Sequence, residues 1–267
     1  MNIITVVLLI IAAVVVTFMV SMVIDPLYAL IFKKPLFLHW YPFINKLRHE
    51  QRQILLREFP FYRKLSDKNK VYFEHRVKAF LLHYRFVGRE NLVVTQEMKI
   101  LVAATYIMLS FGMRRYLINV FRYIILYPGT YYSVNTQQYH KGEYSPKNKA
   151  VVLSWADFLS GLRNSNDNIN LGLHEFGHAL HLNALKSNDT SAAIFTDEFN
   201  KILQYYKDHE LQRQLVSKNY FREYAYENQF EFLAVLLEHF FETPDTFKST
   251  FPELYHNVKT MINYEGE

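Results

Sequence analysis

The chain has 267 residues, half of them hydrophobic, and its 30 Lys and Arg against 25 Asp and Glu give a net charge of +5. Only eight Gly and eight Pro are present, which argues against a disordered, collagen-like or low-complexity chain. The absence of Cys excludes disulfide frameworks, iron–sulfur clusters and thiol nucleophiles, so any metal must be held by His, Asp or Glu. The basic residues form no long run, and we expect no direct contact with nucleic acid.

The first predicted element is a membrane anchor. No residue from Ile3 to Ile24 is charged, and this aliphatic run is just long enough to cross the hydrocarbon core as one helix. A cleavable signal peptide is the alternative, but no Lys or Arg precedes the run and no small-x-small cleavage site follows it. We therefore divide the chain into an anchor at residues 1–25, a juxtamembrane segment at 26–45 and a domain at 46–267.

Basic residues flank the predicted anchor on one side only. They follow it at Lys33, Lys34, Arg48 and Arg52. The positive-inside rule therefore predicts a single spanning helix with the C-terminal bulk of the chain in the cytoplasm. The aromatic residues Trp40, Tyr41 and Phe43 lie either at the level of the lipid headgroups or at the packed edge of the domain.

The domain is predicted to have helices around a small sheet, both before and after the strands in the chain. Apolar residues recur at three- and four-residue steps in Gln51–Phe61, Asp67–Tyr84 and Gln96–Phe111, which indicates amphipathic helices. Two later runs, Tyr123–Tyr127 and Ala150–Trp155, are short and rich in β-branched or aromatic residues, which is typical of strands. Helical patterns return from residue 169, and one of them stops at residue 244, a proline. This order predicts a predominantly helical α+β domain.

The main chemical signal is the H-E-x-x-H motif at residues 174–178, inside the apolar segment Leu171–Leu185. On a helix, this spacing places His174 and His178 on one face, where they can bind one cation with Glu175 beside them. Zinc is the expected metal, and a catalytic zinc takes three protein ligands and keeps one position for a water whose pKa it lowers. Glu175 is then the predicted general base, which accepts the proton of that water.

The residues alone leave the third ligand open. Glu231, which opens a second apolar helix, is the best candidate, and Glu227 and Glu238 are its rivals. In an alternative interpretation, Glu231 is the N3 residue of a capping box that begins with Asn228. The metzincin extension is excluded because position 184 is Ala. The remaining histidines that we considered are expected to lie on the surface, to be hydrogen-bonded or to pack, namely His140, His181, His209 and His239.

Two separated blocks of sequence resemble the zinc peptidases of the Mlc titration factor A family. The first block joins Val151–Trp155 to Gly172–His178, and the second joins Tyr224–Asn228 to Glu231–Val235 and Phe240–Pro244. Weaker similarity extends the resemblance over about residues 46 to 262. The predicted anchor lies outside the family pattern, and Gly177 stands where the family commonly has Ala.

The resemblance implies a set of residue roles and an activity. His174, His178 and Glu231 would bind zinc, Glu175 would be the general base, and Tyr224 would donate a hydrogen bond to the oxyanion. It also implies a zincin-like fold similar to the catalytic domain of anthrax lethal factor, aminopeptidase-like cleavage near a free N-terminus, and binding to a transcriptional regulator.

The sequence therefore predicts a membrane-anchored zinc peptidase that acts on peptide or protein substrates. We expect the substrate to lie as an extended strand beside Ala150–Trp155. The alternative is a membrane-tethered binding module that sequesters a transcriptional regulator and keeps its zinc for structure. A fourth protein ligand, such as Glu227, would favour this alternative because it closes the coordination shell.

Overall fold

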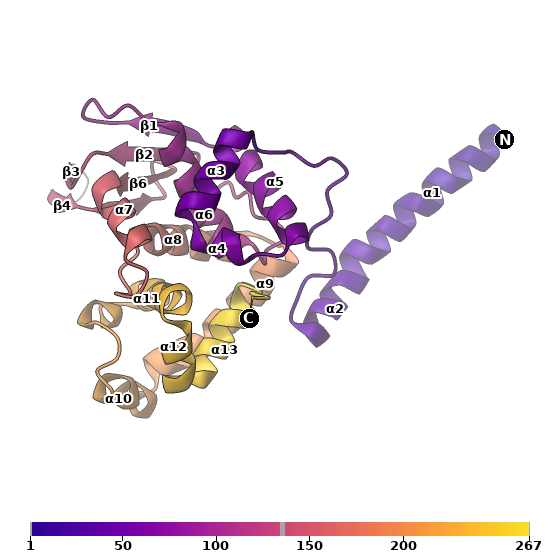
Figure 1. The fold of residues 1–267 in the computed structure, drawn as a ribbon. Coiled ribbons are helices and arrows are strands. Elements are labelled where there is room, and N and C mark those ends of the chain that lie inside the picture. The colour runs from indigo at the N-terminus through magenta and orange to yellow at the C-terminus, as the bar shows by residue number, and fades with distance from the viewer. Residues whose placement is uncertain (1, 134–136, 267) are drawn as a thin grey trace.

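The N-terminal apolar run forms one continuous helix that projects from the rest of the structure (Figure 1). It comprises α1 (Ile3–Met19), a π-helical stretch (Val20–Ile24) and α2 (Asp25–Phe32). In the computed structural model, which describes residues 2–133 and 137–266, this is the one helix long and apolar enough to cross a membrane. A signal sequence would share that property. The helix continues past residue 25 and ends at Lys33, which has a left-handed backbone (φ 54°).

A buried carboxylate ties the end of this helix to the domain. Asp25 is 1% exposed, and it accepts hydrogen bonds from Arg114 Nη1 at 2.7 Å and from the backbone N–H of Leu36 at 3.0 Å. Thr190 donates a further hydrogen bond to the same carboxylate. Arg114 Nη2 also lies 2.9 Å from Asp189 Oδ2, so one guanidinium neutralises two buried acids.

We expect Arg114→Ala to lower the free energy of unfolding of the full-length protein by about 3 kcal/mol, because it leaves two buried carboxylates without their cation. Arg115→Ala is the matched control, since the Arg115 side chain is 72% exposed and reaches Asp189 only at 3.6 Å. Its effect should stay within about 0.5 kcal/mol. Denaturant unfolding in detergent micelles measures both values, and equal stability of the two variants would contradict this account.

The helices in the first half of the domain follow the predicted apolar periodicity. They are α3 (His49–Glu58), α4 (Pro60–Lys64), α5 (Asp67–His83) and α6 (Gln96–Ser110). The predicted helix at Gln51–Phe61 is divided in two, because Pro60 cannot lie inside a helix and instead opens α4. Ser66 and Thr95 begin α5 and α6, since each side chain accepts a hydrogen bond from the backbone N–H three residues on.

The sheet has four strands in the order β1-β2-β6-β5. β1 (Arg85–Gly88), β2 (Tyr123–Tyr127) and β6 (Ala150–Ser154) are parallel, and β5 (Gly142–Ser145) runs antiparallel to β6. Both predicted strands are present. The second ends one residue before Trp155, because the Ser154 hydroxyl accepts the backbone N–H of Asp157 and so begins α7 (Trp155–Arg163).

The other strands are not predicted by the sequence. They are β1, β5 and the antiparallel hairpin of β3 (Tyr131–Ser133) and β4 (Gln138–His140). Segments of three or four residues are too short for periodicity to separate a strand from a loop. Of these strands, β5 changes the position of β6 in the sheet, because β6 is then paired along both edges, with β2 and with β5. The expectation that a substrate lies beside Ala150–Trp155 is therefore wrong, because that strand has no free edge.

The helices after β6 and α7 begin with α8 (Leu171–Lys186), which carries the H-E-x-x-H motif. The others are α9 (Thr190–Lys207), α10 (His209–Ser217), a 3₁₀ turn (Glu223–Tyr226), α11 (Gln229–Glu242), α12 (Pro244–Thr250) and α13 (Pro252–Met261). α8 contacts β5 and β6 on one side and α11 on another. A predominantly helical domain with a small mixed sheet and one apolar N-terminal helix confirms the predicted fold class (Figure 1).

Gly177 marks the contact between α8 and α11. A Cβ at this position would lie 3.0 Å from a methyl group of Leu237 and 3.9 Å from the Cα of Ala234. The missing side chain lets the two helices approach closely, which compensates for the unfavourable helix propensity of glycine. This contact brings the first turn of α11 over the motif.

Candidate metal centre

α8 places three chemically active side chains in the interior of the domain. Asn170 begins the helix, since its side chain accepts the backbone N–H of Leu173 at 3.1 Å. The four-residue spacing then puts His174 and His178 on one face, with ring centroids 4.8 Å apart. His174 and Glu175 are each 6% exposed, so packed neighbours hold both side chains in place.

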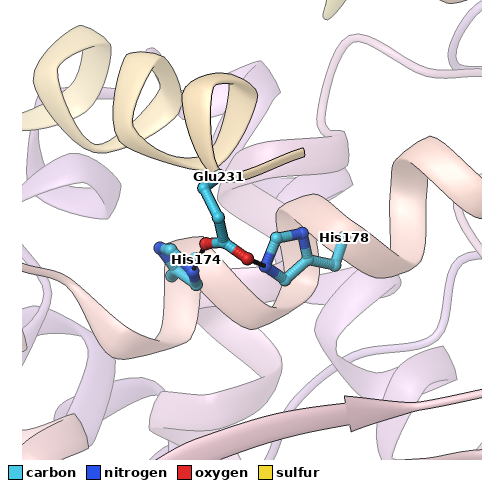
Figure 2. A group of neighbouring side chains, drawn as sticks. All are labelled: His174, His178 and Glu231. Carbon is cyan, nitrogen blue, oxygen red and sulfur yellow. Dashed lines mark ion pairs between the residues drawn. The ribbon is translucent and has the colours of Figure 1, made fainter. Parts of the chain in front are cut away.

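Glu231 reaches both imidazoles from the first turn of α11 (Figure 2). Its Oε2 lies 2.8 Å from His174 Nε2, and its Oε1 lies 3.5 Å from His178 Nε2. Asn228 does cap α11, since its side chain accepts the backbone N–H groups of Phe230 and Glu231. The Glu231 carboxylate faces the histidines, so it does not complete a capping box by returning to the Asn228 backbone.

The three side chains fit a single metal ion. Ligand atoms from His174, His178 and Glu231 all lie within 4.8 Å of one another. Glu231 Oε2 is buried, and its contact with His174 Nε2 at 2.8 Å does not have the geometry of a regular hydrogen bond. A cation between the three residues would satisfy this oxygen, and two His with one Glu form a donor set of catalytic zinc sites.

The electrostatics of this cluster also favour a cation. Burial lowers the pKa of His174, but the contacts with Glu231 and Glu238 outweigh burial and raise that pKa to about 10. Burial opposes ionisation of Glu231, yet its contacts with the two histidines lower the pKa of that carboxyl overall. A proton on His174 therefore supplies the positive charge that the carboxylates require, and a bound metal ion would take its place.

Glu175 lies beside the cluster and is not one of its three members. Burial raises the pKa of Glu175, although the charges of His174 and His178 act in the opposite direction. A carboxyl with a raised pKa suits proton transfer near neutral pH. Gly142 of β5 leaves room for this side chain, because a Cβ on Gly142 would lie only 2.7 Å from Glu175 Oε1.

Glu238 is a supporting residue whose role the sequence leaves open. Its Oε1 lies 3.5 Å from His174 Nδ1, the ring nitrogen remote from Glu231, and accepts the backbone N–H of Asn170 at 3.2 Å. Its Oε2 accepts a hydrogen bond from Arg222 Nη2 at 2.7 Å. Glu238 thus orients the His174 ring and is itself held by a cation, as carboxylates behind metal-ligating histidines commonly are.

Glu238→Gln is expected to lower metal affinity by about 10- to 100-fold, because the amide loses the charge that orients His174 and fixes its tautomer. Competition with a chromogenic chelator measures this change. Glu242→Gln is the control on the same helix, since Glu242 accepts a hydrogen bond from the Asn170 side chain and burial raises its pKa to about 7. Loss of affinity in both variants alike would contradict a specific role for Glu238.

Two candidate residues lie in the turn that leads into α11. The ring of Tyr224 is 5.7 Å from that of His174, measured between centroids, and 41% of the residue is exposed. Burial of part of the ring and the neighbouring Glu231 raise the pKa of Tyr224, so its phenol stays protonated and can donate a hydrogen bond. Glu227 is not a member of the cluster that the described residues form.

The remaining histidines differ in part from the expectation. His181 is not on the surface, because it is only 5% exposed and its ring packs against Phe199 and Phe230. Its Nε2 has no hydrogen-bond partner within the described part of the chain. Burial lowers the pKa of His181 to about 4, so the ring is neutral. His239 packs as predicted, against Tyr220 and other aromatic rings.

Known proteins are similar to this chain over most of its length. The family model of the glucose-regulated metallo-peptidase M90 matches residues 43–262. An uncharacterized protein of Synechocystis sp. is 25% identical over 253 residues, which cover 86% of this chain and 85% of that protein. The range matched by the family model contains α8 and α11, and therefore all three members of the His174, His178 and Glu231 cluster.

Proposed function

Because the chain belongs to the glucose-regulated metallo-peptidase M90 family, it is a metallopeptidase, and we propose that its metal is zinc, held by His174, His178 and Glu231. The family match also confirms the resemblance to the Mlc titration factor A peptidases. The observation that carries the proposal is the convergence of two imidazoles and one carboxylate, whose ligand atoms all lie within 4.8 Å of one another.

We assign Glu175 as the general base. Zinc at this site would polarise the scissile carbonyl and lower the pKa of a water molecule. Glu175 accepts the proton of the attacking water and delivers it to the leaving amine. Its burial, its raised pKa and its place beside the cluster support this role. Three ligands among the described residues favour a catalytic zinc over a structural one, and hence a peptidase over a binding module.

We propose that the substrate adds as an extended strand to β5. This strand pairs with β6 along one edge and contacts α8, and no strand in the described part of the chain pairs with its other edge. Backbone hydrogen bonds along such an edge bind a peptide with little dependence on its side chains. The proposed preference for a free N-terminus rests on the family resemblance.

Tyr224→Phe is expected to lower kcat about 100-fold with little change in KM, because the phenol would donate a hydrogen bond only to the charge that develops on the oxyanion. The matched control is Tyr226→Phe in the same turn, whose hydroxyl has no hydrogen-bond partner among the described residues. Steady-state kinetics of both variants tests this assignment. Equal kcat values for the two variants would contradict it.

The proposed function is tested with the full-length protein in detergent micelles, stripped by a chelator and reloaded with zinc. We expect hydrolysis of alanine p-nitroanilide only after zinc is restored, and slower hydrolysis of the N-acetylated substrate. Zinc-loaded protein that cleaves neither substrate nor a longer peptide would contradict the peptidase proposal. Equal rates for the free and the acetylated substrate would contradict the aminopeptidase preference alone.

We further propose that the peptidase domain faces the cytoplasm from a membrane that the N-terminal helix crosses. The length and composition of that helix and the basic residues Lys33 and Lys34 at its end support this orientation. A cytoplasmic domain would meet protein substrates and a transcriptional regulator, the partner that the family resemblance suggests.

A further inference from the structure

The N-terminal helix is longer than one crossing of a bilayer requires. Ile3–Phe32 contains 30 residues. At 1.5 Å per residue it is about 45 Å long, whereas the hydrocarbon core is about 30 Å thick. A typical tilt of about 20° shortens the span only slightly. α1 and the π-helical stretch already suffice for the crossing, so α2 is left at the surface of the bilayer beside the domain.

α2 has one face on the domain and one apolar face that the described residues leave uncovered. Asp25 and Ala29 are the buried residues of this helix. Its large apolar side chains are between 54% and 68% exposed, namely Leu27, Leu30, Ile31 and Phe32. A contiguous apolar surface of this kind marks a contact with a partner or a membrane.

The segment that follows α2 presents further large apolar side chains. Phe37 is 53% exposed, Trp40 is 76% exposed and Phe43 is 86% exposed. The segment starts beside Asp25, whose carboxylate accepts the backbone N–H of Leu36. Figure 1 shows it on the side of the domain from which the N-terminal helix projects. The exposed aromatic side chains therefore belong to the segment that continues directly from α2, on that same side of the domain.

This segment is held firmly although its rings are exposed. Arg76 is fully buried, and it donates hydrogen bonds to the carbonyl oxygen of Leu38 at 3.2 Å and to the hydroxyl of Tyr41 at 2.5 Å. The backbone N–H of Asn45 donates to His75 Nδ1 at 2.9 Å. The buried guanidinium of Arg76 thus fixes the chain on both sides of Trp40. The exposed position of the Trp40 ring therefore follows from the fold of this segment.

We propose that these side chains form a membrane-contact surface for a phospholipid bilayer. We call it the apolar collar, defined as the exposed apolar side chains of α2 together with Phe37, Trp40 and Phe43. Aromatic and aliphatic side chains of this kind favour the layer between the headgroups and the acyl chains, and the collar is continuous with the helix that enters the bilayer. Lys33 lies between its two parts and pairs with Asp197 at 3.0 Å, so its ammonium is held toward the domain.

The collar has a consequence for the catalytic domain. Because the contacts of Asp25 and Arg114 fix α2 on the domain, the domain sits on the membrane in one orientation and does not hang from a flexible tether. This inference requires the helix to enter a membrane but is independent of the metal and of peptidase activity.

The two tryptophans of the chain allow a direct test. In the full-length Trp155→Phe variant, Trp40 is the one remaining tryptophan, and its emission is excited selectively over that of the tyrosines. The variant is reconstituted in phosphatidylcholine–phosphatidylglycerol vesicles that contain brominated lipids. We expect lipids brominated near the headgroup end of the acyl chains to remove most of the Trp40 emission, and lipids brominated near the chain end to remove less. Phe at position 155 preserves the stacking on Phe158, where the ring centroids are 5.5 Å apart.

Trp40→Phe is the matched control, because it leaves Trp155, which lies at the start of α7 and outside the collar. Its emission should be unaffected by either brominated lipid. If Trp155→Phe folds poorly, the difference between the unmodified chain and Trp40→Phe isolates the same signal. If neither brominated lipid quenches the Trp40 emission, the proposal is overturned. The ring would then lie in water or against a second copy of the chain, and not in the bilayer.

Discussion

Glu175→Gln is expected to lower kcat for peptide hydrolysis about 1,000-fold while the protein keeps its zinc. Gln preserves the shape of the side chain but cannot accept the proton of the attacking water. Because Glu175 is buried and its carboxyl is costly to ionise there, a neutral amide should not weaken the fold. The measurement is kcat with alanine p-nitroanilide, together with the zinc content of the purified variant.

Glu227→Gln is the matched control for this substitution. Glu227 lies close enough to Tyr224 to raise the pKa of its phenol, yet it is outside the cluster of His174, His178 and Glu231. Its kcat should remain near that of the unmodified chain. A zinc-loaded Glu175→Gln variant with unchanged kcat would contradict the assigned role, and a variant that has lost its zinc would show that Glu175 is a ligand instead.

Glu231→Ala is expected to lower zinc affinity by more than about 100-fold, which exceeds the effect of losing a supporting residue such as Glu238. The substitution removes both oxygens that face the two imidazoles, at 2.8 Å and 3.5 Å. The remaining His174 and His178 cannot hold the ion alone, because a catalytic zinc usually takes three protein ligands. Competition with a chromogenic chelator measures the affinity of the full-length variant.

Glu227→Ala is the control for the third ligand, since Glu227 is the rival that the structure leaves outside the cluster. Its zinc affinity should match that of the unmodified chain. If Glu227→Ala loses zinc and Glu231→Ala keeps it, the assignment of the third ligand is wrong.

The part of the site that lies on one helix could be predicted from the sequence. Once Leu171–Leu185 is helical, the four-residue spacing alone brings His174 and His178 to one face. The strands β2 and β6 could also be predicted, because each is a run of five residues dominated by aliphatic or aromatic side chains. These features depend on residues that are close together in the sequence, so the residue pattern of a single segment is enough to predict them.

The third member of the cluster depends on packing between separate helices. Glu231 and Glu238 are seven residues apart on α11, so both lie near one face of it. In the structure, Glu231 lies at Nε2 of His174 and Glu238 lies at Nδ1. This choice is set by the position of α11 along the axis of α8, which the close contact at Gly177 fixes. Periodicity within one helix carries no such information. The residues alone make Glu231 the best candidate but leave a capping-box role equally open, and the family resemblance decides between the two.

The proposed substrate edge illustrates the same limit in the sheet. β5 contains Gly142 and Ser145 and is four residues long, so its sequence resembles a loop. Its pairing with β6 is a contact between strands, which the composition of either strand leaves undetermined. Because β5 is not recognised in the sequence, the hydrophobic run at residues 150–154 is the predicted strand nearest to the motif. The sequence therefore suggests that a substrate pairs with β6, which has no free edge in the structure.

The most direct test is zinc stoichiometry combined with X-ray absorption at the zinc edge, on full-length protein and on Glu231→Ala. We predict one zinc per chain, with two imidazole nitrogens, oxygen from Glu231 and one position free of protein ligands. The spectrum should change in Glu231→Ala, together with the loss of affinity. A zinc held by four side chains, or a spectrum that Glu231→Ala leaves unchanged, would contradict the catalytic centre described for this chain.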